Sequence, residues 1–304
     1  MRKPNLFIIG AMKSGTTSLH QYLSEHPDIS MSTFKEPSYF LTPEEVRDVY
    51  FEAWAQGFWK SENTYLALFP DADKKTIIGE SSTNYTKMNK VTCCAEKIKT
   101  FNPDAKFIYL MRDPVHRTIS HYFHEFRRGE EKKGILQALA ENPYYIETSD
   151  YAFQLAPFMN VFDRSRFLFL TTEAMQRDPR ATYRQVCEWL GVDAAFLPPS
   201  LGSRVHETPE EMLVPRGGAG KMLIHAYHLL KTHTGLREPK ALRAFLMRMV
   251  KRPTQRSETR EQEEIAIRYL RPIMQEKVAR LVPLIGRDFP EWRTLAAAGE
   301  TVSH

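Results

Sequence analysis

The segment Gly10–Thr17 (GAMKSGTT) constrains the fold of this chain more than any other feature. It follows a short apolar run, Leu6–Ile9, and precedes a helical pattern. Small residues let backbone N–H groups approach an anion, and the first turn of the following helix adds partial positive charge. A glycine-containing turn between a buried strand and a helix is typical of a phosphate-binding loop. The alternative is a plain glycine turn that binds nothing.

Short apolar runs elsewhere predict the rest of the sheet. Runs of this length indicate parallel strands buried on both faces, and helical patterns lie between or after them. We therefore expect an α/β fold in a single domain over residues 1–304, with a P-loop-like parallel sheet flanked by helices on both faces. Ligands of such sheets bind beyond the carboxyl ends of the strands. The four predicted strands are Leu6–Ile9, Thr76–Ile78, Phe107–Met111 and Phe167–Leu170.

Helix start and stop signals support this interpretation. Asp113-Pro114 and Asp178-Pro179 each combine a capping carboxylate with proline at the first helical position. Gly191 offers a stop for the second of these helices. The residues expected on buried helix faces are Leu19, Tyr22 and Leu23 after the glycine turn, and Tyr183, Val186, Cys187 and Leu190 before Gly191.

The position of the lysine separates this turn from the loop of the nucleoside triphosphatases. Thr16 stands where that pattern has its lysine, and the lysine of this turn is Lys13. No obvious acidic partner for Mg²⁺ follows a later strand, because Asp113 is expected to cap a helix and Glu80 lies among small polar residues. A small-molecule kinase of the P-loop class remains an alternative.

The run Phe7–Leu19 resembles the 5′-phosphosulfate loop of sulfotransferases that use 3′-phosphoadenosine 5′-phosphosulfate (PAPS). It is closest to the branch that contains the heparan sulfate sulfotransferases and related bacterial enzymes. The resemblance implies PAPS as co-substrate, 3′-phosphoadenosine 5′-phosphate (PAP) as product, and no metal. Lys13 would also stabilise charge on the departing nucleotide. The residues implied to hold the 5′ phosphosulfate are Lys13, Ser14, Gly15, Thr16 and Thr17.

A second motif, Lys35–Phe40 (KEPSYF), resembles the Lys-Glu-Pro-x-aromatic-Phe motif of the same branch. The resemblance implies that Glu36 takes the acceptor's proton and that Lys35 orients the sulfuryl oxygens or tunes Glu36. Independently, an alcohol or amine attacks sulfur well only if its proton leaves as the new bond forms. Many relatives have His where this chain has Ser38, so no second titratable group is expected there. A surface Lys-Glu pair before a turn is the alternative.

A third motif, Tyr109–Arg117 followed by Ser120, resembles the 3′-phosphate site of the family. Arg112 ends a predicted strand, where a guanidinium can bind phosphate through two hydrogen bonds. Ser120 lies about two turns into the next helix and can donate its hydroxyl. The histidines of this region are expected to be surface or helix-packing residues rather than metal ligands: His116, His121 and His124.

Weaker matches extend the resemblance along the chain. The segment Gly79–Tyr85 aligns with a family segment that lines the acceptor cleft, which implies acceptor contacts for Glu80 and Ser81. Glu80 is a second candidate base, and Tyr39 is a further candidate for acceptor binding. Residues Arg216, Gly217 and Gly218 resemble a late loop that closes over the 3′ phosphate, although a flexible surface loop fits equally. The stretch 284–292 is similar to the family's closing helix and tryptophan.

Basic residues are concentrated between positions 202 and 256. Eleven Lys or Arg and four Glu give this segment a net charge of +7, against +5 for the whole chain. Such a segment suits an anionic ligand or surface, and equally a solvated helical face. Residues 239–252 can form a basic amphipathic helix that covers the core or contacts an anionic membrane. A non-catalytic module that binds polyanions or membranes is therefore a second alternative.

Partners and setting are predicted only in outline. No apolar run approaches the ~20 residues of a membrane span. Three cysteines without disulfide or metal spacing indicate a reducing, cytoplasmic setting. We expect a small-molecule or saccharide acceptor and no nucleic acid, and we leave peripheral membrane contact open. Saccharide, lipid, phenol and polyketide alcohol all remain open as acceptors, as does O- versus N-sulfation.

Overall fold

The computed structural model describes residues 2–203, 213–215, 251–253 and 256–296. Arg216, Gly217, Gly218 and most of the basic segment 202–256 lie outside the described residues. The expectations for them stay predictions.

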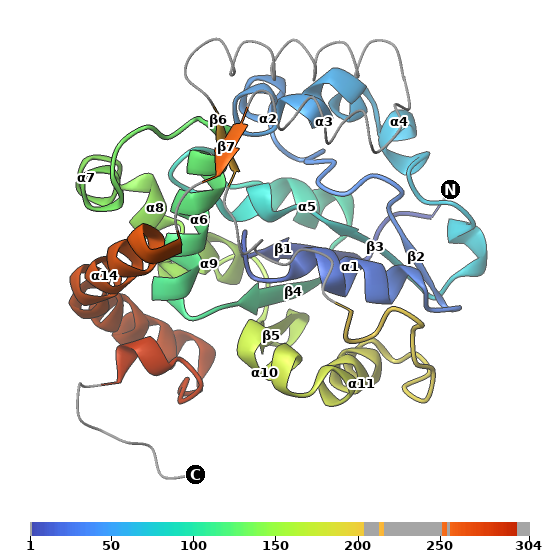
Figure 1. Cartoon of the computed structure of the whole chain (residues 1–304). Coiled ribbons are helices and arrows are strands. Elements are labelled where there is room, and N and C mark those ends of the chain that lie inside the picture. The colour runs from blue at the N-terminus through green and yellow to red at the C-terminus, as the bar shows by residue number, and fades with distance from the viewer. Residues whose placement is uncertain (1, 204–212, 216–250, 254–255, 297–304) are drawn as a thin grey trace.

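A five-stranded parallel sheet forms the centre of the fold, with strand order β2-β3-β1-β4-β5 (Figure 1). The strands are β1 Leu6–Gly10, β2 Ile29–Met31, β3 Ile77–Ser81, β4 Lys106–Met111 and β5 Phe167–Thr171. All four predicted strands are confirmed. The prediction missed β2, whose three residues Ile-Ser-Met form no continuous apolar run. It also ended β3 too early, because the last residues of that strand are Glu80 and Ser81, which are polar but fully buried.

Helices cover both faces of this sheet, as expected (Figure 1). Their bounds are α1 Thr16–Ser24, α2 Pro43–Val49, α3 Phe51–Gln56, α4 Glu62–Leu66, α5 Ala95–Phe101, α6 Pro114–Arg128, α7 Ile135–Glu141, α8 Tyr144–Glu147, α9 Tyr151–Met159, α10 Thr172–Arg177, α11 Pro179–Leu190 and α14 Arg256–Ile285. Short 3₁₀ helices include η3 Thr83–Thr86 and η5 Arg293–Leu295. Strands β6 Leu213–Pro215 and β7 Lys251–Pro253 form a separate antiparallel pair.

Side chains alternate between the two faces of the sheet, as strand geometry requires. Leu6 and Ile8 pack in one core with α1, α10 and α11. Phe7 and Ile9 pack in a second core with α2 to α5, α9 and the end of α14. The same alternation continues on β4 and β5, so both faces of the sheet are apolar. This explains why the strands appear in the sequence as continuous apolar runs.

The helix signals are confirmed. The Asp113 carboxylate accepts hydrogen bonds from the backbone N–H groups of Val115 and His116, and Gly191 ends α11 with a φ of 78°. Asp113 also accepts from the backbone N–H and the hydroxyl of Thr294. This contact ties the end of the described chain, with the buried Trp292, to the start of α6.

Among the described helices, none is both long enough and apolar enough to cross a membrane.

Candidate active site

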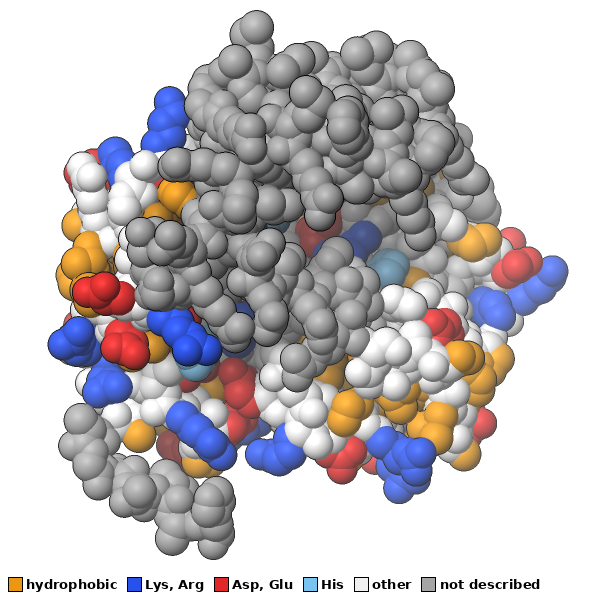
Figure 2. Space-filling view, in the orientation of Figure 1, with side chains coloured by type: hydrophobic (Ala, Val, Ile, Leu, Met, Phe, Trp, Pro, Cys, Tyr) orange, Lys and Arg blue, Asp and Glu red, His pale blue; other side chains and the backbone are white. Residues whose placement is uncertain are grey.

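A cleft of about 1190 Å³ lies at the carboxyl ends of the central strands. It contains residues that follow β1, β3 and β4, and it brings together most of the site residues predicted from the sequence. Figure 2 shows acidic, basic and histidine side chains close together near the centre of the face that it presents. The predicted residues that line the cleft are Lys13, Gly15, Thr16, Thr17, Lys35, Glu36, Arg112 and Ser120.

The turn between β1 and α1 is held in a backbone conformation that leaves the start of α1 uncapped. Gly15 has a φ of 89°, and no described side chain caps the helix that follows it. This left-handed backbone conformation favours glycine, whereas the Met175 side chain near the position of a Cβ could move aside. The Thr172 hydroxyl donates to the Ser14 carbonyl at 2.6 Å and thereby fixes the turn to the end of β5. Since no side chain in the described ranges caps α1, its first N–H groups can donate to an anion.

Two cations from the predicted motifs, Lys13 and Arg112, line the cleft. Neither the Lys13 ammonium nor the Arg112 guanidinium forms a hydrogen bond or ion pair with the residues that the structure describes. Burial, with the nearby Arg127 and Arg112, lowers the pKa of Lys13 to about 8. The Ser14 hydroxyl is buried and also has no partner among the described residues. These groups are donors without acceptors, which is what a site for an anionic ligand requires.

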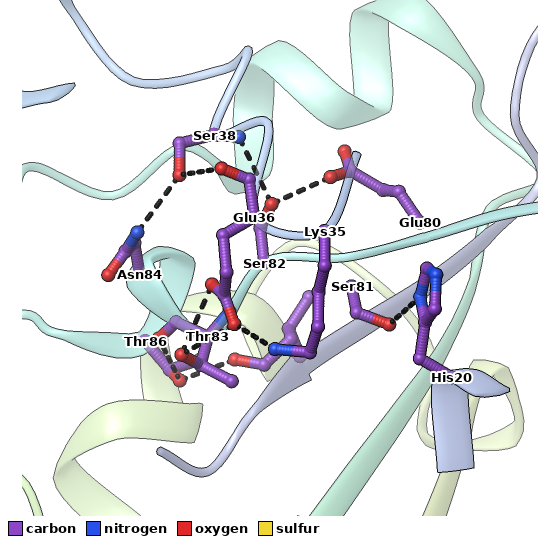
Figure 3. Close-up of polar contacts among 11 residues, drawn as sticks. His20, Lys35, Glu36, Ser38, Glu80, Ser81, Ser82, Thr83, Asn84 and Thr86 are labelled. Atoms are coloured by element: carbon purple, nitrogen blue, oxygen red, sulfur yellow. Dashed lines mark hydrogen bonds and ion pairs between the residues drawn. The ribbon is translucent and has the colours of Figure 1, made fainter. Parts of the chain in front are cut away.

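The Glu36 carboxylate is fixed at the start of η3 (Figure 3). It accepts hydrogen bonds from the backbone N–H of Thr83 at 2.6 Å and from the Thr83 hydroxyl at 3.2 Å. The Lys35 ammonium forms an ion pair with the same carboxylate. The Glu36 side chain is 15% exposed, toward the cleft that it lines. A carboxylate held in this way can meet a hydroxyl or amine that enters the cleft.

Three predicted acceptor residues do not line the cleft. Because side chains alternate along β3, Glu80 points into the core that contains Tyr65 and Tyr85, while Ser81 faces α1 and contacts His20 at 2.8 Å. Glu80 is fully buried, and burial raises the pKa of its carboxyl to about 7. Tyr39 stacks on Tyr65 with 4.2 Å between ring centroids, and it borders a separate groove.

Other cleft residues were missed from the sequence. Lys87 follows η3, is only 6% exposed, and its ammonium has no partner among the described residues. On α6, His124 and Arg128 share a face with Ser120, since residues four apart lie one above the other. Burial, followed by the charge of Lys13, lowers the pKa of His124 to about 3. The spacing from Ser120 was the signal available in the sequence.

The histidines of α6 differ in their roles. His121 is fully buried and packs against Tyr144 and Tyr145, as predicted for a helix-packing residue. His124 is half-buried and lines the cleft, a position that the sequence did not predict. Arg117 is buried and donates to the Tyr145 carbonyl at 2.7 Å. Within the part of the chain that the structure describes, no group of three or more His, Cys, Asp or Glu is placed to hold a metal ion.

The chain belongs to the Sulfotransferase family, whose sequence model matches residues 4–195. It is similar to the membrane-associated sulfotransferase kil1 of Dictyostelium discoideum, with 36% identity over 119 residues, 39% of this chain and 22% of that protein. It is 28% identical over 199 residues to the mouse heparan sulfate glucosamine 3-O-sulfotransferase 3B1, covering 62% of this chain and 46% of that protein. The chain thus spans less than half the length of these curated relatives.

A solved structure supports the fold. The sulfotransferase from Alicyclobacillus acidocaldarius superposes with a TM-score of 0.67 at 25% identity, covering 96% of this chain and 100% of that one. The class of protein defined by the fold is therefore that of a sulfotransferase.

Proposed function

We propose that this chain transfers a sulfuryl group from PAPS to a hydroxyl or amine of a small-molecule or saccharide acceptor by in-line displacement. The observation that carries the proposal is the convergence, in one cleft, of the Lys13–Thr17 turn, Arg112 with Ser120, and the fixed carboxylate of Glu36. Membership of the Sulfotransferase family supports sulfuryl transfer in general. The donor and the roles of these residues are our inference.

The cleft residues fit a donor that carries two anionic groups. The uncapped start of α1 and Lys13 would bind the 5′ phosphosulfate, and the buried Ser14 hydroxyl lies in the same turn. Arg112 and Ser120 would bind the 3′ phosphate, which ordinary adenine nucleotides lack. Neither cation has a partner among the described residues, which supports this division, since each could bind a phosphate without breaking a pair seen there.

The reaction would proceed in one displacement at sulfur. Glu36 accepts the proton of the acceptor hydroxyl or amine as that atom forms its bond to sulfur. The bond from sulfur to the 5′-phosphate oxygen breaks, and this oxygen keeps the electron pair as PAP leaves. Lys13 and the N–H groups at the start of α1 stabilise the charge that develops on that oxygen. Lys35 holds the Glu36 carboxylate in place.

The acceptor would bind between η3 and α6. Rings of Tyr50, Phe51 and Tyr144 line the cleft, and Lys87 adds a cation to which the proposed donor site assigns no role. Aromatic rings next to a free ammonium suit a ring-shaped acceptor with an anionic substituent. The mouse relative is named for its action on heparan sulfate glucosamine. By analogy we propose a saccharide as the preferred class of acceptor, and a small alcohol or amine as the next candidate.

Replacement of Arg112 by alanine tests the proposed 3′-phosphate site. We expect Arg112→Ala to weaken PAP binding by about 10- to 100-fold, because a hydrogen bond to a charged group contributes about 1.5–3 kcal/mol. Isothermal titration with PAP measures this loss. Arg47→Ala is the matched control, since Arg47 lines the cleft but pairs with Asp48. Unchanged affinity of Arg112→Ala would remove Arg112 from the donor site.

A P-loop kinase would need ATP and Mg²⁺. We therefore expect sulfuryl transfer from PAPS to persist in EDTA. In a separate assay with Mg²⁺ and no EDTA, we expect no phosphoryl transfer from ATP. Phosphoryl transfer that EDTA abolishes would favour the kinase. PAP binding without transfer to any acceptor would favour a non-catalytic module.

A further inference from the structure

The segment that carries Glu36 has an unfavourable backbone conformation. Glu36 has a φ of 66° and Ser38 a φ of 55°, although neither residue is glycine. Side chains disfavour this left-handed region, so two such residues so close together persist only where their surroundings fix them. Pro37 between them removes one backbone donor. The segment 36–39 must therefore be held from outside.

The end of β3 and the start of η3 hold this segment. The Glu36 N–H donates to the Ser81 carbonyl at 2.8 Å, and the Ser38 N–H donates to the Ser82 hydroxyl oxygen at 3.1 Å. The Asn84 amide donates to the Ser38 hydroxyl at 3.0 Å. Figure 3 shows Ser38 linked to both Asn84 and Ser82, and Ser82 linked on its other side to Glu80. Ser38 is fully buried, so these bonds are sheltered from water.

Glu80 fixes the direction of the Ser82 hydroxyl. That hydroxyl donates its one proton to the Glu80 carboxylate at 2.7 Å, which leaves its oxygen free to accept the Ser38 N–H. The other carboxylate oxygen accepts the Tyr65 hydroxyl at 2.7 Å and the Tyr85 hydroxyl at 2.8 Å. Tyr65 in turn stacks on the Tyr39 ring with an interplanar angle of 3°. Glu80 thus reaches residues 38 and 39 by two routes.

Glu80 itself cannot meet an acceptor in this structure. Its side chain is fully buried, three hydroxyls donate to its two oxygens, and it does not line the cleft. We propose that Glu80 is a positioning residue, whose buried carboxylate holds the segment 36–39 so that Glu36 faces the acceptor, and that Glu80 takes no part in proton transfer. The proposal rests on the proposed function for the role of Glu36.

The variant Glu80→Gln tests this proposal because it replaces one acceptor oxygen with an N–H₂ donor. With that donor facing Ser82, the Ser82 hydroxyl loses the acceptor for its proton. Its oxygen is then no longer oriented to accept the hydrogen bond from the Ser38 N–H. Ser82→Ala removes the same link without changing the buried carboxylate. Tyr85→Phe is the matched control, since the Tyr85 hydroxyl contacts Glu80 but makes no described hydrogen bond to residues 36–39.

We expect Glu80→Gln and Ser82→Ala to lower kcat by about 10- to 100-fold, because a small misplacement of a reacting group costs rates of this order. PAP affinity should stay within about twofold, since the donor residues lie elsewhere in the cleft. The pH–rate profile should keep its wild-type shape, because Glu80 takes no part in proton transfer. Amide hydrogen exchange, followed by mass spectrometry, should accelerate over residues 35–40 and not over 10–17. Tyr85→Phe should exchange like the wild type over residues 35–40.

Two results would overturn the proposal. One is wild-type kcat and wild-type exchange over residues 35–40 in both Glu80→Gln and Ser82→Ala. The other is a change in the shape of the pH–rate profile in Glu80→Gln with unchanged exchange, which would make Glu80 the base. The exchange measurement needs no turnover. If the wild-type protein transferred no sulfuryl group, the proposed function would fail while the contact from Glu80 to the segment 36–39 was still tested.

Discussion

Lys13→Met should lower kcat for sulfuryl transfer by about 10²–10³-fold, the loss that follows removal of one donor to a developing oxyanion. Lys13 lines the cleft and has no partner among the described residues, so its ammonium is available for the departing phosphate. Methionine keeps the unbranched chain and removes the charge. Steady-state kinetics with PAPS, together with a thermal melt to check folding, measure the effect.

Lys90→Met is the matched control for this substitution. Lys90 also lines the cleft, but its ammonium lies over the Tyr144 ring, 4.2 Å from the centroid. We expect it to change kcat less than tenfold. Equal losses in the two variants would mean that any positive charge in the cleft suffices, and they would contradict a specific role for Lys13.

The pKa of Lys13 adds a pH dependence to the same prediction. Burial and the nearby arginines lower it to about 8, so the free protein loses the ammonium as pH rises through that value. Donor binding needs the protonated form, and kcat/KM for PAPS should therefore fall above a pH of about 8. A profile of kcat/KM against pH checks this. The fall in kcat/KM at alkaline pH should be absent from Lys13→Met. If the fall persisted in that variant, it would belong to another group.

Glu36→Gln should lower kcat by about 10²–10⁴-fold, the range that general-base catalysis contributes. Glutamine keeps the shape and can still accept from Thr83, but it cannot take a proton from the acceptor. PAP affinity should be unchanged within about twofold. Kinetics and titration on the same preparation separate the two effects.

Glu52→Gln serves as control for the base, since Glu52 lines the cleft and is half-buried there. It should retain most of the wild-type kcat. Full activity in Glu36→Gln would remove Glu36 as base. Because Glu80 is sealed in the core, Glu125, which lines the cleft and whose pKa burial raises to about 7, would then be the carboxyl to test.

Local chemistry explains what the sequence could predict. Apolar runs buried on both faces marked β1, β4 and β5, and the Asp-Pro pairs marked the first residues of α6 and α11. Residues directly after strands, Lys13 and Arg112 among them, meet in the cleft because parallel strands end at one edge.

Contacts between distant segments explain what was missed. Glu80 and Ser81 appeared to follow a strand, yet β3 continues through them and alternation turns their side chains into the two cores. Lys87 lines the cleft from the end of η3, and no local pattern in the sequence marks it. His124 lines the cleft from α6, where only its spacing from Ser120 indicates it. The acceptor contacts were therefore the least predictable part of the site.

Transfer of label from [³⁵S]PAPS to a panel of acceptors, in EDTA, tests the central claim most directly. The panel holds neutral and anionic saccharides, a phenol and a long-chain alcohol. We predict a labelled product with at least one acceptor, most with an anionic saccharide, and loss of that product in Glu36→Gln and Lys13→Met. No labelled product from any acceptor with folded, PAP-binding protein would contradict the assignment of this cleft to sulfuryl transfer.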